Sequence, residues 1–284
     1  MHDDRLEKLA QNAEAGWARA RELDDQCRLA WEHAHKLDRA LQDCVKLLQG
    51  ASYHADALAV WDKNIEFLRD PRFAEAYRAG MQSGHHILRP RGSDADIHIE
   101  WRVHMLCWAA AHATRLEGDF VECGVNTGIY SLAVCRYVGF ESLDRDFWLF
   151  DTFCGIPESH MTADERPQRI AENASLYSEC YEIAAHNFAP YRRAKLIRGT
   201  VPETLRSVEI DKVAYLSIDL NLVEPERAAI AHFWPRLVPG ALVVLDDYGW
   251  AHFASQKRAM DDFARSVGVE IATLPTGQGL LIKP

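Results

Sequence analysis

The sequence predicts an α/β fold in which a mostly parallel, seven-stranded sheet carries helices on both faces and follows a long N-terminal helix. From residue 119 onward, short apolar runs alternate with segments that have the spacing of amphipathic helices. Strands separated by helices form βαβ units, and such units build parallel sheets. Before residue 50, small and apolar residues recur every seven positions, which is typical of a coiled-coil helix. Apolar residues make up 48% of the chain, enough for a full core.

The elements of the sheet domain follow from these patterns. Parallel strands are expected at 120–123, 147–150, 195–198, 214–218 and 241–245. Helices are expected at 129–138, 178–188, 224–234 and 254–267. The segments 270–274 and 279–282 flank a Pro-Thr-Gly turn, so we expect an antiparallel hairpin that closes the sheet at one edge.

Residues 1–50 are predicted to form one coiled-coil helix, because 5–49 contain no proline and charged residues separate two apolar rows. One row is Leu6, Ala13, Ala20, Cys27, Ala34, Leu41 and Leu48, and the other is Leu9, Gly16, Leu23, Ala30, Leu37 and Cys44. We expect this helix to form a homo-oligomer or to dock on a partner protein. The alternative is a long helix that lies along its own domain. Trp17 and Trp31 lie outside both rows and are a candidate second contact surface.

Residues 51–118 are predicted to be a helical connecting or lid region, with helices at 55–68, 71–81 and 97–116 and a break at 89–92. The remaining residues, 119–284, form the α/β domain.

Composition excludes several classes of protein. The net charge of −10 argues against general binding of nucleic acid, which needs a basic face. There is no run of 18 apolar residues, so we expect no membrane span, and the charged N-terminus does not resemble a signal peptide. The seven cysteines include no Cys-x-x-Cys pair, which indicates reduced thiols and a cytoplasmic protein.

The stretch from Phe120 to Gly128 predicts a cofactor site. A strand ending at Cys123 turns sharply into a helix, and such a turn points backbone N–H groups at a ligand above the strand end. The spacing Glu-x-Gly-x-x-x-Gly differs from the Gly-x-Gly-x-x-Gly of dinucleotide sites, which argues against an NAD-binding oxidoreductase. The acid favours a ligand with hydroxyl or ammonium donors, such as S-adenosylmethionine (SAM). The candidate SAM-binding residues in this stretch are Glu122, Gly124, Asn126 and Gly128.

Further SAM contacts are expected after the next two strands. Asp151 and Thr152 follow the second strand, and a carboxylate there can accept both hydroxyl protons of a ribose. The alternative is that Asp151 caps a turn. Gly199 and Thr200 follow the third strand and would lie near the adenine.

Three carboxylates are expected at the same edge of the sheet. Asp219 ends the fourth strand, and Asp246 and Asp247 end the fifth. Adjacent acids repel one another unless a cation compensates, and an all-oxygen set suits Mg²⁺ or Mn²⁺. The alternative is a helix cap or a loop salt bridge.

The combination of motifs resembles the macrocin-type sugar O-methyltransferases. The motifs are Val-Glu-Cys-Gly-Val-Asn-Thr-Gly at 121–128, Phe-Asp-Thr-Phe-Cys-Gly-Ile-Pro at 150–157, Asp-Leu-Asn at 219–221, Trp-Pro-Arg-Leu-Val-Pro-Gly at 234–240 and Leu-Asp-Asp-Tyr at 245–248. The resemblance covers about 118–284. It implies a Rossmann-like class I methyltransferase, dependent on SAM and Mg²⁺, that methylates deoxysugar hydroxyls of macrolides and related glycosides.

By this resemblance Glu122, Gly124 and Asp151 would bind SAM, and the three aspartates would hold the metal. The chain departs from the family pattern in two places. Asn221 stands where the family often has a second aspartate, and Asn126-Thr127 replaces a glycine-richer loop. The N-terminal coiled coil is not part of the usual pattern.

The working hypothesis is a metal-dependent O-methyltransferase that transfers the methyl group of SAM to a sugar hydroxyl of a glycoside or polysaccharide. Candidates for the general base are Asp247, Asp219 and His252, in that order. The segment 158–177 resembles a lid, and the alternative is a plain surface excursion. Candidate contacts of the acceptor are Gln278 and, from the helix before the first strand, Trp101, Arg102 and His104. The alternatives are a catechol-like or other small hydroxylated acceptor, and a non-catalytic scaffold that uses the coiled coil.

Overall fold

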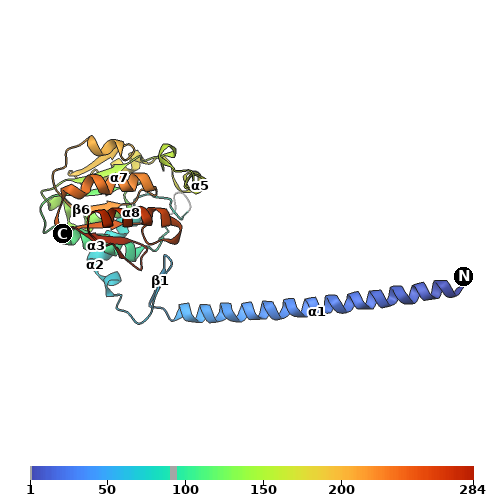
Figure 1. Ribbon diagram of the computed structural model, residues 1–284. Helices are drawn as coiled ribbons and strands as arrows, with labels where there is room; N and C mark the ends of the chain where they lie inside the picture. Colours follow the sequence, from blue (N-terminus) through green and yellow to red (C-terminus); the bar gives the residue numbers. More distant parts are fainter. Residues whose placement is uncertain (1, 90–94) are drawn as a thin grey trace. The chain divides into compact units, whose positions relative to one another are not determined.

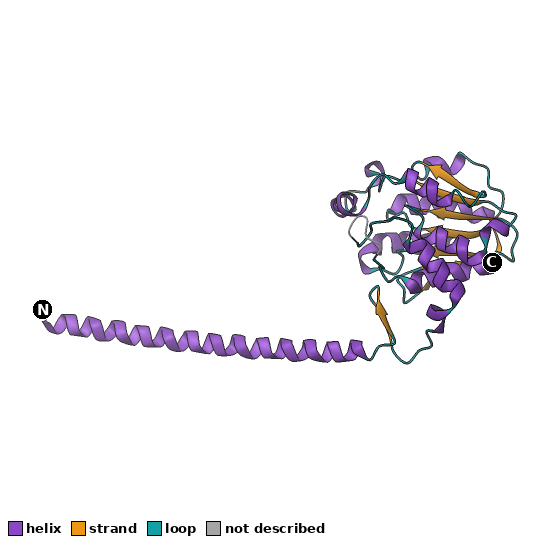
Figure 2. Cartoon of the chain, turned by 180° about the vertical axis from the view of Figure 1, so that it is seen from behind, coloured by secondary structure: helices purple, strands orange, loops and turns teal. Residues whose placement is uncertain are grey.

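The computed structural model describes residues 2–89 and 95–284 and is shown in Figures 1 and 2. The chain divides into two compact units: Met1–His54 with Ala59–Lys63, and Ala55–Leu58 with Asn64–Pro284. A search of the described helices finds none that combines the length and the apolar character needed to cross a bilayer. All seven cysteines are free thiols in the described part of the chain.

The first unit is built on one helix, α1 (His2–Gln49), which confirms the helix expected at 5–49. Charged pairs one turn apart reinforce it, as Arg28 contacts Asp25 at 3.1 Å and Glu32 at 3.2 Å. Each exposed pair of this kind stabilises a helix by about 0.2–0.5 kcal/mol. Large apolar side chains remain exposed on α1, including Trp17 at 71% and Trp31 at 65%.

The helix predicted at 55–68 is wrong. The segment forms β1 (Tyr53–Ala55), β2 (Leu58–Val60) and the 3-10 helix η1 (Glu66–Arg69). Asp56 and Ala57 make the two-residue connection, and both have positive φ, at 51° and 55°. A short apolar run fits the strand period and the helix period equally well, so periodicity did not distinguish them.

The second unit contains the seven-stranded sheet, in the order β5-β4-β3-β6-β7-β9-β8. The strands are β3 (Asp119–Cys123), β4 (Phe147–Asp151), β5 (Ala194–Arg198), β6 (Val213–Ile218), β7 (Leu237–Leu245), β8 (Ala272–Thr273) and β9 (Gly279–Ile282). The first five pair in parallel, while β9 pairs antiparallel with both β7 and β8. The predicted parallel sheet with an antiparallel hairpin at its edge is therefore confirmed.

Helices cover both faces of this sheet, as Figure 2 shows. They are α2 (Pro71–Met81), α3 (Glu100–Ala113), α4 (Ile129–Val138), α5 (Arg166–Leu176), α6 (Tyr181–Phe188), α7 (Val223–Phe233) and α8 (Ala254–Ser266). Short 3-10 turns connect them: η2 (Phe140–Ser142), η3 (Glu158–His160), η4 (Glu203–Arg206), η5 (Trp234–Arg236) and η6 (Ala251–Phe253).

Alternate residues of each strand face different cores, because side chains of a strand point to opposite faces of the sheet. Phe120 and Tyr215 belong to the core beneath α2, α3, α4 and α6. Val121 and Leu216 belong to the core beneath α7 and α8. Burying each such side chain contributes about 1.5–3 kcal/mol. Both faces of the central strands are thus apolar, so the polar residues of the sheet gather where the strands end.

Candidate functional site

A cavity lies at the carboxyl edge of the parallel strands, where the segments that follow β3 to β7 meet. Most of the residues that the sequence predicted for the site line this cavity. They are Gly124, Asn126, Asp151, Thr152, Gly199, Asp219, Asp246 and Asp247. The other four, Glu122, Gly128, Thr200 and His252, are not among the described residues that line it.

The turn after β3 depends on Gly124, which has a φ of 93°. Its N–H donates to the carbonyl oxygen of Phe150 at 2.8 Å. A Cβ atom built on Gly124 would overlap the backbone carbonyl of Asp219, with the carbonyl carbon only 2.6 Å away. Because glycine has no side chain, the end of β6 can lie directly against the turn, and this close approach places Asp219 beside the glycine turn.

Glu122 and Gly128 support the turn from outside the cavity. The Glu122 carboxylate is buried, and one of its oxygens accepts a hydrogen bond from the Ser131 hydroxyl at 3.2 Å. Burial raises the pKa of Glu122 well above its ordinary value. Gly128 precedes α4 with a φ of 102°, and a Cβ atom there would lie 2.7 Å from the ring of Phe188.

Asp151 links the second strand to the glycine turn. One carboxylate oxygen accepts the N–H groups of Val125 at 2.5 Å and Asn126 at 2.8 Å. The other accepts the N–H of Phe153 at 2.5 Å. These bonds hold the carboxylate in one orientation in the cavity wall. They use both lone pairs of Oδ2 and leave one lone pair of Oδ1 for a ligand. Gly199 lies next to it, since its N–H donates to the Asp151 carbonyl at 2.9 Å.

The three predicted aspartates meet at one point of the cavity. Asp219, Asp246 and Asp247 each place a carboxylate oxygen within 4.8 Å of the other two. Burial, reinforced by the neighbouring acids, raises the pKa of Asp219 and of Asp247 well above the ordinary value. The Oδ2 atom of Asp247 is buried and has no hydrogen-bond partner among the described residues. A cation or a proton at this point would relieve the repulsion.

Asp246 differs from its two neighbours because donors surround it. Arg102 donates to Oδ2 at 2.8 Å, and the Tyr130 hydroxyl donates to the same oxygen at 3.2 Å. Gln278 donates to Oδ1 at 3.1 Å. Sequence reasoning placed Arg102 and Gln278 at the acceptor and missed Tyr130 altogether. These residues lie on α3, on α4, directly after β7 and directly before β9, so no local sequence pattern could have predicted their contact.

The segment 158–177 carries η3 and α5 and is tied to the domain. Glu165, at the start of α5, accepts the N–H of Val223 at 2.8 Å. Arg169 is only 2% exposed, and its guanidinium lies 4.3 Å from the centre of the Phe253 ring. Tyr177, directly after α5, lines the cavity. The rest of the segment is not among the described residues that line the cavity, and its role as a lid stays a prediction.

His252 lies in η6 and is exposed. Its place outside the cavity wall leaves Asp247 and Asp219 as the base candidates at the site.

The fold is that of the class I methyltransferases, with the ligand cavity at the carboxyl ends of the strands. The solved structure of the O-methyltransferase NovP matches with a TM-score of 0.59 and 22% identity, covering 74% of this chain and 87% of that one. The calicheamicin methyltransferase CalS11 matches with a TM-score of 0.51 and 17% identity, covering 75% and 93%. At these identities the two matches support the fold alone.

Residues 102–273 match the macrocin-O-methyltransferase (TylF) family, and the chain belongs to this family. A tetracenomycin-type rhamnosyl 4'-O-methyltransferase of Streptomyces olivaceus is 31% identical over 50% of this chain and 57% of its own length. The mycinamicin III 3''-O-methyltransferase of Micromonospora griseorubida is 25% identical over 50% and 59%. The chain thus spans a little more than half the length of these relatives.

Proposed function

We propose that this chain is a SAM-dependent O-methyltransferase whose acceptor is a sugar hydroxyl of a glycoside or polysaccharide. The observation that carries the proposal is the acidic cluster placed beside the glycine turn in one cavity. Its relatives support the substrate class, since one is named as an O-methyltransferase of a rhamnosyl tetracenomycin and another as an O-methyltransferase of mycinamicin III.

We further propose that Asp219, Asp246 and Asp247 hold a divalent ion, Mg²⁺ or Mn²⁺. The residues fit such an ion, because the donors are all carboxylate oxygens and a buried oxygen of Asp247 lacks a partner among the described residues. A bound ion would supply Lewis acidity that makes a sugar hydroxyl easier to deprotonate.

Other steps of the reaction are assigned to individual side chains. Asp247 is the first candidate for the base, because its buried Oδ2 atom has no hydrogen-bond partner among the described residues and can accept a proton. Asp151 and the closely approaching backbone of the glycine turn orient the cofactor. Tyr177, which lines the cavity directly after α5, helps to exclude water from it. Orientation and exclusion of water matter most here, because the sulfonium of SAM is already an activated methyl donor.

This function is tested by binding and transfer measured on the full chain. We expect calorimetry to show micromolar binding of SAM and no binding of NAD. We expect labelled SAM to methylate deoxysugar glycosides in preference to catechols. Transfer to catechols alone would favour the small-acceptor alternative. SAM binding without transfer to any hydroxylated acceptor would favour the scaffold alternative.

We also propose that α1 mediates self-association. Its exposed Trp17, Trp31 and Leu37 side chains would be covered by a second copy of the helix. Deletion of residues 1–50 is expected to lower the number of chains per particle in light scattering, with SAM affinity unchanged. A truncated protein of the same oligomeric state would contradict this role for α1.

A further inference from the structure

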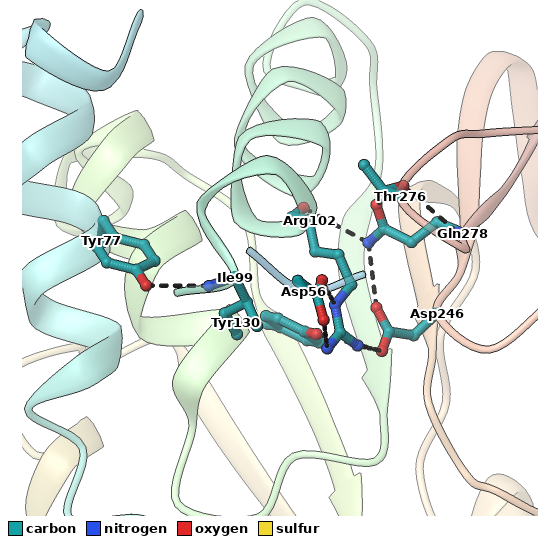
Figure 3. Close-up of polar contacts among 8 residues, drawn as sticks. All are labelled: Asp56, Tyr77, Ile99, Arg102, Tyr130, Asp246, Thr276 and Gln278. Atoms are coloured by element: carbon teal, nitrogen blue, oxygen red, sulfur yellow. Dashed lines mark hydrogen bonds and ion pairs between the residues drawn. The ribbon is translucent and has the colours of Figure 1, made fainter. Parts of the chain in front are cut away.

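The guanidinium of Arg102 lies between two carboxylates, as Figure 3 shows. Its Nε and one terminal nitrogen donate to the two oxygens of Asp56, at 2.7 and 3.0 Å. Its other terminal nitrogen donates to Asp246 at 2.8 Å. All three side chains are largely buried, with exposures of 14%, 13% and 4% for Arg102, Asp56 and Asp246. Both ion pairs are therefore stronger than surface pairs.

Asp56 reaches this position from the turn between β1 and β2. Asp56 and Ala57 both adopt left-handed backbone conformations. The conformation is tolerated by aspartate but costs about 1–2 kcal/mol for alanine. A strained turn that presents a carboxylate to a buried arginine indicates a role beyond connecting two strands.

The remaining contacts hold Asp246 still. Gln278 donates to its Oδ1 atom and in turn accepts the Thr276 hydroxyl at 2.9 Å. Tyr130 donates to its Oδ2 atom. Asp246 thus accepts hydrogen bonds from Arg102 and Tyr130 at Oδ2 and from Gln278 at Oδ1. Asp247 differs, because its Oδ2 atom has no hydrogen-bond partner among the described residues.

We propose that Arg102 and Asp56 are positioning residues that set the cation affinity of the aspartate cluster in opposite directions. Arg102 lowers the affinity, because its positive charge competes with an ion for Asp246. Asp56 raises the affinity, because it neutralises Arg102 and draws the guanidinium away from Asp246. The inference rests on the proposed metal site.

The experiment is a titration of the metal-free full chain with Mn²⁺, followed by electron paramagnetic resonance of the free ion. Arg102→Gln is expected to tighten Mn²⁺ binding about tenfold, and Asp56→Asn to weaken it about tenfold, each shift being about 1.4 kcal/mol. Arg206→Gln and Asp211→Asn make the same charge changes at exposed positions and are expected to leave the affinity within about twofold. Calorimetric SAM binding verifies that each variant is folded.

The double variant Asp56→Asn/Arg102→Gln removes both partners and avoids a buried unpaired charge, so it protects the test against failure of the Arg102 variant to fold. It is expected to bind Mn²⁺ about as tightly as Arg102→Gln, which is about a hundredfold more tightly than Asp56→Asn alone, because Asp56 acts through Arg102.

The Mn²⁺ affinities distinguish a wrong role for Arg102 and Asp56 from the absence of the metal site itself. Weakening by both single variants, or a double variant as weak as Asp56→Asn, would overturn the inference and leave the metal site intact. A wild-type chain that binds no Mn²⁺ at millimolar concentration would overturn the metal site and the inference together.

Discussion

Replacement of Asp247 by asparagine is expected to lower the rate of methyl transfer about a thousandfold while SAM affinity changes by less than about threefold. Asparagine has nearly the same shape, but it cannot accept a proton at neutral pH and is a weaker ligand for a hard cation. Asp151, and not Asp247, is hydrogen-bonded to the glycine turn, so we expect binding of the cofactor to depend little on the Asp247 charge. Steady-state rates with labelled SAM and calorimetry of SAM binding measure the two quantities.

The unfolding temperature of the metal-free protein distinguishes a loss of catalysis from a loss of folded stability. Burial raises the folded-state pKa of Asp247, so its contribution to stability is present below the ordinary aspartate pKa and is lost as the pH rises through the folded-state value. The substitution removes the cost of burying this acid, and at pH 7 the metal-free variant is expected to unfold at a higher temperature than wild type. A lower unfolding temperature would contradict this account.

Asp262→Asn is the matched control, because Asp262 is exposed and pairs only with Arg265 one turn away on α8 in the contacts described. Its turnover is expected to equal that of wild type. Treatment with EDTA should abolish wild-type turnover, and added Mg²⁺ should restore it. Full activity in EDTA would exclude the proposed metal, whatever the Asp247 variant does.

Replacement of Gly124 by alanine is expected to reduce the free energy of unfolding by more than about 4 kcal/mol. The added Cβ atom would overlap the Asp219 carbonyl, which belongs to backbone and cannot rotate away. The left-handed φ of 93° adds a second cost. Denaturant titration followed by circular dichroism measures the loss.

Gly268→Ala measures the cost of the left-handed backbone conformation alone, without a steric overlap. Gly268 has a φ of 73°, and a Cβ atom built there meets nothing within 4 Å among the described residues. Its cost is therefore expected to be about 1 kcal/mol. If the two alanine variants were equally stable, the close approach of β6 to the glycine turn would not exist in solution.

Much of the fold could be predicted because its signals are local. Each central strand is a short apolar run, and the glycine turn after β3 follows from the spacing of Gly124 and Gly128. Helix α4 begins and ends where the sequence placed it, at 129 and 138. Strand β8 is shorter than predicted, at two residues, because an edge strand has one neighbour to extend its pairing.

The hairpin before η1 could not be predicted from apolar spacing, and nothing in the sequence indicated that its turn contacts the aspartate cluster through Arg102. Asp56 matters only because α3 brings Arg102 to it from 46 positions further along the chain. The same holds for Gln278, which is not among the described residues that line the cavity and instead donates a hydrogen bond to Asp246. Pairings of this kind depend on which elements pack together, and residue type alone does not reveal them.

The sequence by itself determined the strands of the main sheet, the family of the chain, and the presence of three aspartates at neighbouring strand ends. These properties follow from short-range periodicity and from the rule that parallel strands end at one edge of a sheet. Only the tertiary structure decided how the three acids differ, with Asp247 lacking a described donor and Asp246 shared with Arg102. The reason is physical: the charge and hydrogen bonding of a buried carboxylate depend on whatever folding places within a few ångströms of it.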